Sequence, residues 1–218
     1  MRPYVHVNVA MSADGKLSTR ERRQVRISGQ SDFERVDRLR AETDAIMVGI
    51  GTILADDPSL TVKSVMLRKK RHDRGMDEHP MRVVVDSSAR IPPDASVLLK
   101  GEGKRVIACS SRAPLDRIEA LRQCATVIVA GSEEVDLKAL LEGLGSMGVR
   151  RLMVEGGGTL IWGLISLHLV DEITCYIGNI LIGGRDAPTL AEGEGYVREE
   201  EFPRLNLKEV LPTDDGLL

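Results

Sequence analysis

Hydrophobic positions occur along this chain in short, almost continuous runs, separated by longer segments with helical periodicity. Runs such as "AIMVGI" and "RVVVD" are typical of central strands covered on both faces. They predict strands at Val5–Met11, Ala45–Ile50, Arg82–Asp86, Arg105–Cys109, Thr126–Val129, Arg151–Val154 and Glu172–Ile182. Strands joined by helices predict an α/β fold, with a mostly parallel central sheet and helices on both faces.

The first predicted helix begins at a capping box, in which Ser31 would cap the helix and Glu34 stands three residues later. Its periodicity turns Phe33, Val36 and Leu39 toward the interior. The segments "APLDRIEALRQC" and "VDLKALLEGLGSMG" predict two further amphipathic helices, the second of which ends at a glycine.

Two segments depart from this alternation. Residues 63–80, "KSVMLRKKRHDRGMDEHP", are polar and basic and lack a hydrophobic period. They predict a solvated surface loop, or a basic flap near an anionic ligand. Near the C-terminus, "DEITCYIGNILIGG" is followed by "LNLKEVLP" with no helix between them, which predicts antiparallel hairpins at one edge of the sheet.

Composition narrows the class of protein. The 218 residues favour one domain, 1–218, and a hydrophobic fraction of 42% argues against disorder. A net charge of -3 and 3% aromatic residues argue against a nucleic-acid partner. No apolar run approaches the roughly 18 residues of a membrane helix, and the N-terminus resembles a strand, so we expect a cytoplasmic protein without a membrane partner. The three cysteines and four histidines lack ligand spacing, and no metal site is predicted.

Two glycine-rich turns follow predicted strands. Gly49 and Gly51 begin like a dinucleotide fingerprint, but Leu54 replaces the third glycine, so the turn predicts either close backbone approach to a ligand or only a tight connection. Gly156–Gly158 stand between a strand and a helix, where backbone N–H groups can cradle an anion. Glu155 ends that strand, at the sheet edge where open α/β folds bind ligands.

Further polar residues follow other strands. The segments "MSADGK" and "LADDPSLT" are polar turns that carry no chemistry on their own. Asp86–Arg90 and Ser110–Arg112 each offer hydroxyls and an arginine at a strand end. That combination suits a phosphate group, such as the 2′-phosphate that distinguishes NADP from NAD.

Five blocks of sequence, taken together, resemble one family. "VAMSADGKLS", "LRAETDAIMVGIGTILADDPSLTV", "PMRVVVDSSARIP", "LMVEGGGTLIWGLI" and "LVDEITCYIGNILIGG" occur in the order found in the reductases of riboflavin biosynthesis, in their archaeal stand-alone form. The resemblance implies a dihydrofolate-reductase-like fold with an antiparallel C-terminal edge. The bacterial relatives carry a zinc deaminase as well, whose H-x-E and P-C-x-x-C motifs are not found here. The family usually adds a last strand after "DGLL", so the edge strand is expected to be shortened or cut.

The resemblance also implies site residues. The cofactor contacts fall on Ala10, Thr52, Asp56, Ser87, Ser88, Ala89, Arg90, Glu155, Gly156, Gly157, Gly158 and Thr159. The substrate contacts fall on Gln24, Arg40, Leu60, Lys63 and Glu155, of which Arg40 and Lys63 suit the substrate phosphate. Asp56 and Glu155 are the candidate catalytic carboxylates.

The implied reaction is reduction of a ribosylamino group on a pyrimidinone 5′-phosphate. The ribose ring opens to an imine-like form, and NADPH, with NADH as the alternative, supplies hydride to its C1′. The resemblance implies a homodimer. Two other functions stay open, a dihydrofolate reductase and a non-catalytic nucleotide-binding protein on the same scaffold. The scarcity of aromatic residues argues against a stacked pterin pocket, and the combination of Asp56, Arg40 and Glu155 argues against the non-catalytic protein.

Overall fold

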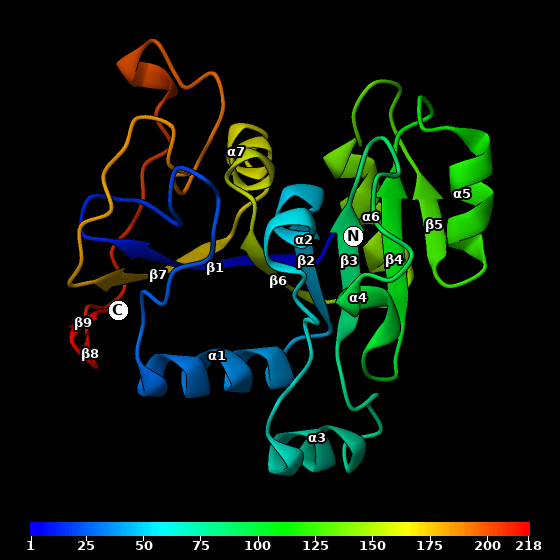
Figure 1. The fold of residues 1–218 in the computed structure, drawn as a ribbon, viewed down its shortest axis with the longest axis horizontal. Coiled ribbons are helices and arrows are strands. Elements are labelled where there is room, and N and C mark those ends of the chain that lie inside the picture. The colour runs from blue at the N-terminus through cyan, green and yellow to red at the C-terminus, as the bar shows by residue number, and fades with distance from the viewer.

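A single nine-stranded sheet organises the computed structural model, which describes residues 1–218 (Figure 1). The strand order is β5-β4-β3-β2-β6-β1-β7-β9-β8. The strands are β1 (Tyr4–Ser12), β2 (Ala45–Gly49), β3 (Met81–Val85), β4 (Arg105–Cys109), β5 (Thr126–Val129), β6 (Arg151–Gly156), β7 (Glu172–Gly178), β8 (Pro212–Thr213) and β9 (Gly216–Leu217). The first seven pair in parallel, and β9 runs antiparallel to β7 and β8.

Helices cover both faces of the sheet. They are α1 (Gln30–Glu42), α2 (Ile50–Asp56), α3 (Val65–His72), α4 (Ser96–Leu99), α5 (Leu115–Arg122), α6 (Leu137–Ser146), α7 (Gly158–Ser166) and the 3-10 helix η1 (Glu199–Glu201). The expected fold class, a mostly parallel sheet between helices with an antiparallel C-terminal edge, is confirmed. No helix combines the length and the apolar character needed to cross a membrane.

Alternation along the strands divides the interior into two hydrophobic cores. Val5, Val7 and Val9 of β1 face α6 and α7, whose buried leucines fill the larger core. Ile46 and Val48 of β2 face the opposite way, toward α2, α4 and α5. Because successive strand residues point to opposite faces, β1 turns His6, Asn8 and Ala10 away from its valines.

The predicted cap of α1 is wrong. The N-cap is Gly29, and the Ser31 side chain makes no capping hydrogen bond. The carboxylate of Asp214, in the turn between β8 and β9, accepts hydrogen bonds from the backbone N–H groups of Ser31 and Asp32 at 3.1 and 3.0 Å. Phe33, expected to be buried, is 47% exposed because α1 faces the sheet with other side chains.

Residues 63–80 are not the irregular loop predicted as one alternative. Ser64 caps α3 by accepting a hydrogen bond from the Leu67 backbone N–H, and Arg71 is buried. The Arg71 guanidinium donates to the carbonyls of Ala41, Thr43 and Asp77. This buried cation takes the place of apolar anchor residues, which is why the helix shows no hydrophobic period.

The C-terminal edge also differs in detail. Strand β7 ends at Gly178, earlier than predicted, and it lies parallel to β1. The antiparallel hairpin is formed by β8 and β9, much later in the chain than "DEITCYIGNILIGG".

Candidate functional site

The predicted site residues gather at one edge of the sheet. Because the strands are parallel, the carboxyl ends of β2, β3, β4 and β6 lie along the same edge, which we call the carboxyl edge. Thr52, Ser87 and Glu155 all follow or end these strands. Motifs up to about one hundred residues apart in sequence are thereby brought to one side of the molecule.

Glu155 and Arg40 form the strongest ion pair at this edge. The Arg40 Nε and Nη2 each donate to one Glu155 carboxylate oxygen at 2.6 Å, and Nη1 donates to the Thr61 carbonyl at 3.2 Å. The side chains are 18% and 10% exposed. Burial disfavours the guanidinium charge, but Glu155 outweighs it and raises the pKa of Arg40. Three Arg40 nitrogens therefore already have protein partners.

The segment Ser59–Ser64, which we call the strap, joins α2 to α3 beside the C-terminal end of α1 (Figure 1). Its Lys63 ammonium donates to the hydroxyls of Ser59 and Thr61 at 2.8 and 3.0 Å. Lys63 has no carboxylate partner. Burial, and then the positive charge of Arg40, lower the pKa of Lys63. A cation flanked by two hydroxyls can bind an anionic group such as a phosphate.

The glycine turn brings two connections into contact. A Cβ on Gly157 would stand 3.5 Å from Gly49, and one on Gly156 would stand 3.4 Å from the Thr52 hydroxyl. Gly156 and Gly157 have φ of +150° and +88°, which L side chains rarely adopt. Gly158 has a different constraint, because a Cβ there would lie 2.5 Å from the Thr189 carbonyl. The third glycine thus makes room for the chain's own backbone.

The hydroxyl and arginine motifs meet at the ends of β3 and β4. Arg112 donates to the Ser88 hydroxyl at 3.1 Å and pairs with Glu133 at 3.4 Å. Ser87 instead accepts from the Val135 N–H, while its carbonyl accepts from Ser110. The exposed Arg112 and the half-buried Ser88 are therefore the better placed of these groups to bind a phosphate.

Arg90 and Ala89 take structural positions beside that pair. Arg90 lies 3.7 Å from the buried Asp86 carboxylate, and Ala89 is buried with a φ of +53°. The Asp86 carboxylate also accepts the Ile91 N–H at 2.8 Å. These contacts fix the turn after β3.

The remaining predicted residues lie on several different elements. Ala10 is half-buried on β1, and Asp56 is exposed at the end of α2, where partial desolvation raises its pKa. Leu60 is buried in the strap, with a φ of +51°. Thr159 is exposed in the first turn of α7, and Gln24 is exposed in the irregular segment before α1 without a hydrogen-bond partner.

Sequence reasoning missed a polar group between α1 and the sheet. Asn8 is buried, and its side-chain carbonyl accepts from Arg35 at 2.8 Å. Arg35 also pairs with the buried Asp32 at 2.7 Å. A polar residue at the centre of an otherwise apolar strand was the available signal, and it lies on the α1 face of β1.

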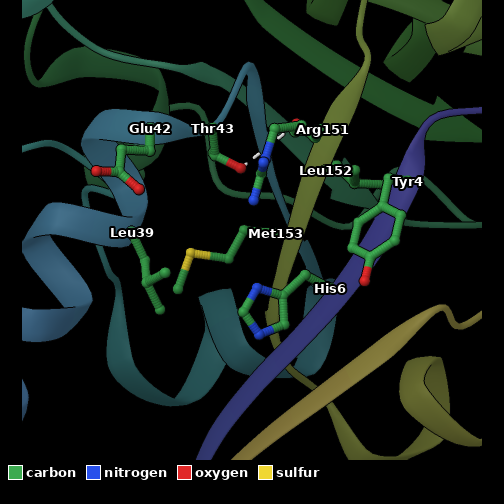
Figure 2. A pocket seen from close by; sticks show the side chains of 8 residues that line it. All are labelled: Tyr4, His6, Leu39, Glu42, Thr43, Arg151, Leu152 and Met153. Carbon is green, nitrogen blue, oxygen red and sulfur yellow. Dashed lines mark hydrogen bonds between the residues drawn. The ribbon is translucent and has the colours of Figure 1, made fainter.

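A small pocket lies at the amino-terminal ends of β1 and β6, at the opposite edge of the sheet from the carboxyl edge (Figure 2). It is lined by the amino-terminal halves of β1 and β6 and by the end of α1: Tyr4, His6, Leu39, Glu42, Thr43, Arg151, Leu152 and Met153. Its volume of about 10 Å³ is close to that of a single water site. It is too small for a nucleotide, and the carboxyl edge is the better candidate.

Comparison with known proteins connects this geometry to a family. The sequence profile described as the RibD C-terminal domain matches residues 3–218. The chain is 57% identical over 199 residues to 2,5-diamino-6-ribosylamino-4(3H)-pyrimidinone 5′-phosphate reductase of Archaeoglobus fulgidus, covering 91% of this chain and 90% of the relative. It is 47% identical over 218 residues to the reductase of the same name from Methanothermobacter thermautotrophicus, covering 100% and 97%.

A solved structure shows the same architecture. RibD of Acinetobacter baumannii superposes with a TM-score of 0.80 at 25% sequence identity. The match covers 99% of this chain and 56% of that one, so the present chain corresponds to just over half of that protein.

Proposed function

The chain belongs to the RibD C-terminal domain family, and from this premise we propose how its carboxyl edge serves the reductase reaction of riboflavin biosynthesis. The chain is a reductase of that pathway and acts on a small phosphorylated pyrimidine. The observation that supports the location of the site is the proximity of the strap to the Arg40–Glu155 pair, because Arg40 contacts both.

The substrate phosphate binds the strap. Lys63 supplies the charge, and the hydroxyls of Ser59 and Thr61 supply further hydrogen bonds. Arg40, expected from the sequence to share the phosphate, instead orients Glu155 and holds the Thr61 carbonyl. Glu155 then accepts hydrogen bonds from polar groups of the substrate next to the ribose.

A reductase of this family uses a nicotinamide cofactor, and the carboxyl edge fits one. The close approach of Gly49 and Gly157 leaves the connecting backbone free of side chains, and Arg112 with Ser88 can bind a 2′-phosphate. We assign Ala10, Thr52, Asp56 and Thr159 to the cofactor as well. We therefore assign NADPH as the preferred cofactor, with NADH as the weaker alternative. When bound, the cofactor supplies the hydride.

The chain's own residues position the substrate and provide for the proton. Opening of the ribose ring moves the proton of the exocyclic nitrogen to the ring oxygen and leaves a C1′=N bond. Reduction then adds hydride to C1′ and a proton to the nitrogen. Asp56 is the proposed proton donor, since partial burial raises its pKa and keeps more of the acid form available. Glu155 orients the substrate and is itself held in place by two hydrogen bonds from Arg40.

Discrimination between the phosphorylated and dephosphorylated substrates tests whether the substrate phosphate binds the strap. We expect the wild-type protein to show a much lower KM for the phosphorylated substrate than for its dephosphorylated form. Lys63→Ala should lose at least about tenfold of that discrimination, because one charge-assisted contact disappears. Equal discrimination in the two proteins would place the phosphate elsewhere.

Cofactor preference tests the phosphate site at the ends of β3 and β4. Arg112→Ala should narrow the NADPH to NADH affinity ratio, whereas Arg90→Ala should narrow it less because Arg90 faces Asp86. A ratio unchanged by both substitutions would remove the 2′-phosphate from this position.

The homodimer and the cytoplasmic location stay predictions. Light scattering would check whether the protein is a homodimer.

A further inference from the structure

The strap has no regular secondary structure, although it carries the proposed phosphate ligands. Helices and strands are ordered by their backbone hydrogen bonds, which this segment lacks. Here charged side chains from two helices supply that order instead. Leu60, buried with φ +51°, anchors the beginning of the strap in the core.

Asp37, on α1, holds the end of the strap. Its two carboxylate oxygens accept the backbone N–H groups of Lys63 and Ser64 at 2.7 and 2.8 Å. Arg68, on α3, donates to the carbonyls of Val62 and Lys63 at 3.3 and 2.9 Å. The peptide groups on both sides of the Lys63 Cα are therefore fixed by side chains of opposite charge.

This arrangement also sets the direction of the Lys63 side chain. Once its backbone is fixed, the ammonium reaches the hydroxyls of Ser59 and Thr61, which are themselves 2.9 Å apart. Arg40 holds the Thr61 carbonyl at the other end. Asp37 and Arg40 lie one helical turn apart on α1, so one helix face determines the position of the whole strap.

We propose that Asp37 is a positioning residue of the substrate-phosphate site and acts by orienting Lys63, with Arg68 as its partner on the other side of the strap. This inference rests on the proposed function. Asp37 does not contact the substrate. Its effect on catalysis comes from the lower entropy cost of binding when the ammonium and hydroxyls are already in place.

Asp37→Asn tests the proposal. The amide retains one acceptor oxygen, and its NH₂ group faces a backbone donor, so one of the two strap contacts is lost. We expect KM for the phosphorylated substrate to rise about fivefold or more. The value of kcat, the KM for the dephosphorylated substrate and the affinity for NADPH should change little.

Asp44→Asn is the matched control. Asp44 also accepts two consecutive backbone N–H groups, those of Arg150 and Arg151 at 2.9 Å each, but it does so at the amino end of β6. Both variants remove a carboxylate charge beside two backbone N–H groups, so a general effect of that change on the fold would appear in both. The proposal requires the selective loss of phosphate discrimination in Asp37→Asn alone, together with faster amide exchange at Lys63 and Ser64.

Arg68→Met keeps the proposal testable if Asp37→Asn does not fold, and the same selective rise in KM is expected from it. The proposal is overturned if the folded variants discriminate against the dephosphorylated substrate as strongly as Asp44→Asn does. Absence of wild-type turnover would contradict the proposed function instead. The amide exchange at Lys63 and Ser64 would still report whether Asp37 orders the strap.

Discussion

Arg40 and Glu155 each neutralise a charge that would otherwise lie largely buried and unpaired. Both side chains are mostly shielded from water, and both Glu155 oxygens accept hydrogen bonds from Arg40. Removal of one member of such a pair leaves the desolvation cost of the other without compensation. A substitution at Glu155 should therefore affect folding as well as substrate binding.

Glu155→Gln should lower the free energy of unfolding by about 2 kcal/mol, because one hydrogen bond from Arg40 is lost and the other loses its charged acceptor. It should also raise KM more than it lowers kcat, since the role we propose for Glu155 is to orient the substrate. Urea unfolding and steady-state kinetics measure the two effects. Glu119→Gln is the control, because Glu119 and Arg122 form an exposed pair whose loss should change stability little. Equal unfolding midpoints for the two variants would contradict this interpretation.

Asp56→Asn separates proton donation from simple orientation. If Asp56 donates the proton, kcat of the wild-type protein should fall as the pH rises above the raised pKa of this carboxyl, because the acid form is lost. The amide cannot titrate, so kcat of the variant should be low and nearly independent of pH, while NADPH affinity is kept. A wild-type kcat in Asp56→Asn from pH 5 to 9 would assign the proton to water or the substrate.

At the scale of the elements, the sheet was predictable because its strands are short and nearly all apolar. The residue that caps α1 and the helical structure of α3 were not predictable in this way. Asp214 caps α1 from a hairpin more than 180 residues later in the chain, and Ser31 merely resembles a local cap. Helix α3 packs through the buried Arg71, whose carbonyl partners are visible only in the fold.

Asp214→Ala should loosen α1 at its first turn, because two backbone N–H groups lose their acceptor. Faster amide exchange at Ser31 and Asp32 is the expected result, with α6, which is capped locally by Asp136, as the unchanged reference. Hydrogen bonding from Ser31 lowers the pKa of Asp214. The stabilisation is therefore present above the ordinary carboxyl pKa and is lost as the pH falls through the lowered one. Unchanged exchange in α1 would contradict this assignment.

At the scale of the whole molecule, parallel strands explain why motifs that follow different strands come to the same edge, where the candidate site lies. Glu155 and the Asp86–Arg90 turn could be placed at one edge from topology alone. The strap could not, because its order depends on contacts from α1 and α3 that have no local sequence signal. Asp37 looked like an ordinary exposed helix residue, yet its carboxylate accepts two strap N–H groups.

The most direct test of the reductase reaction is isotope transfer from cofactor to product. The protein is incubated with the ribosylaminopyrimidinone 5′-phosphate and NADPH deuterated at the transferable C4 position, and the product is analysed by mass spectrometry and NMR. We expect a ribitylamino product with one deuterium at C1′, and no labelled product when dihydrofolate replaces the substrate. Label transfer to dihydrofolate, or cofactor binding without any labelled pyrimidine product, would contradict this reaction.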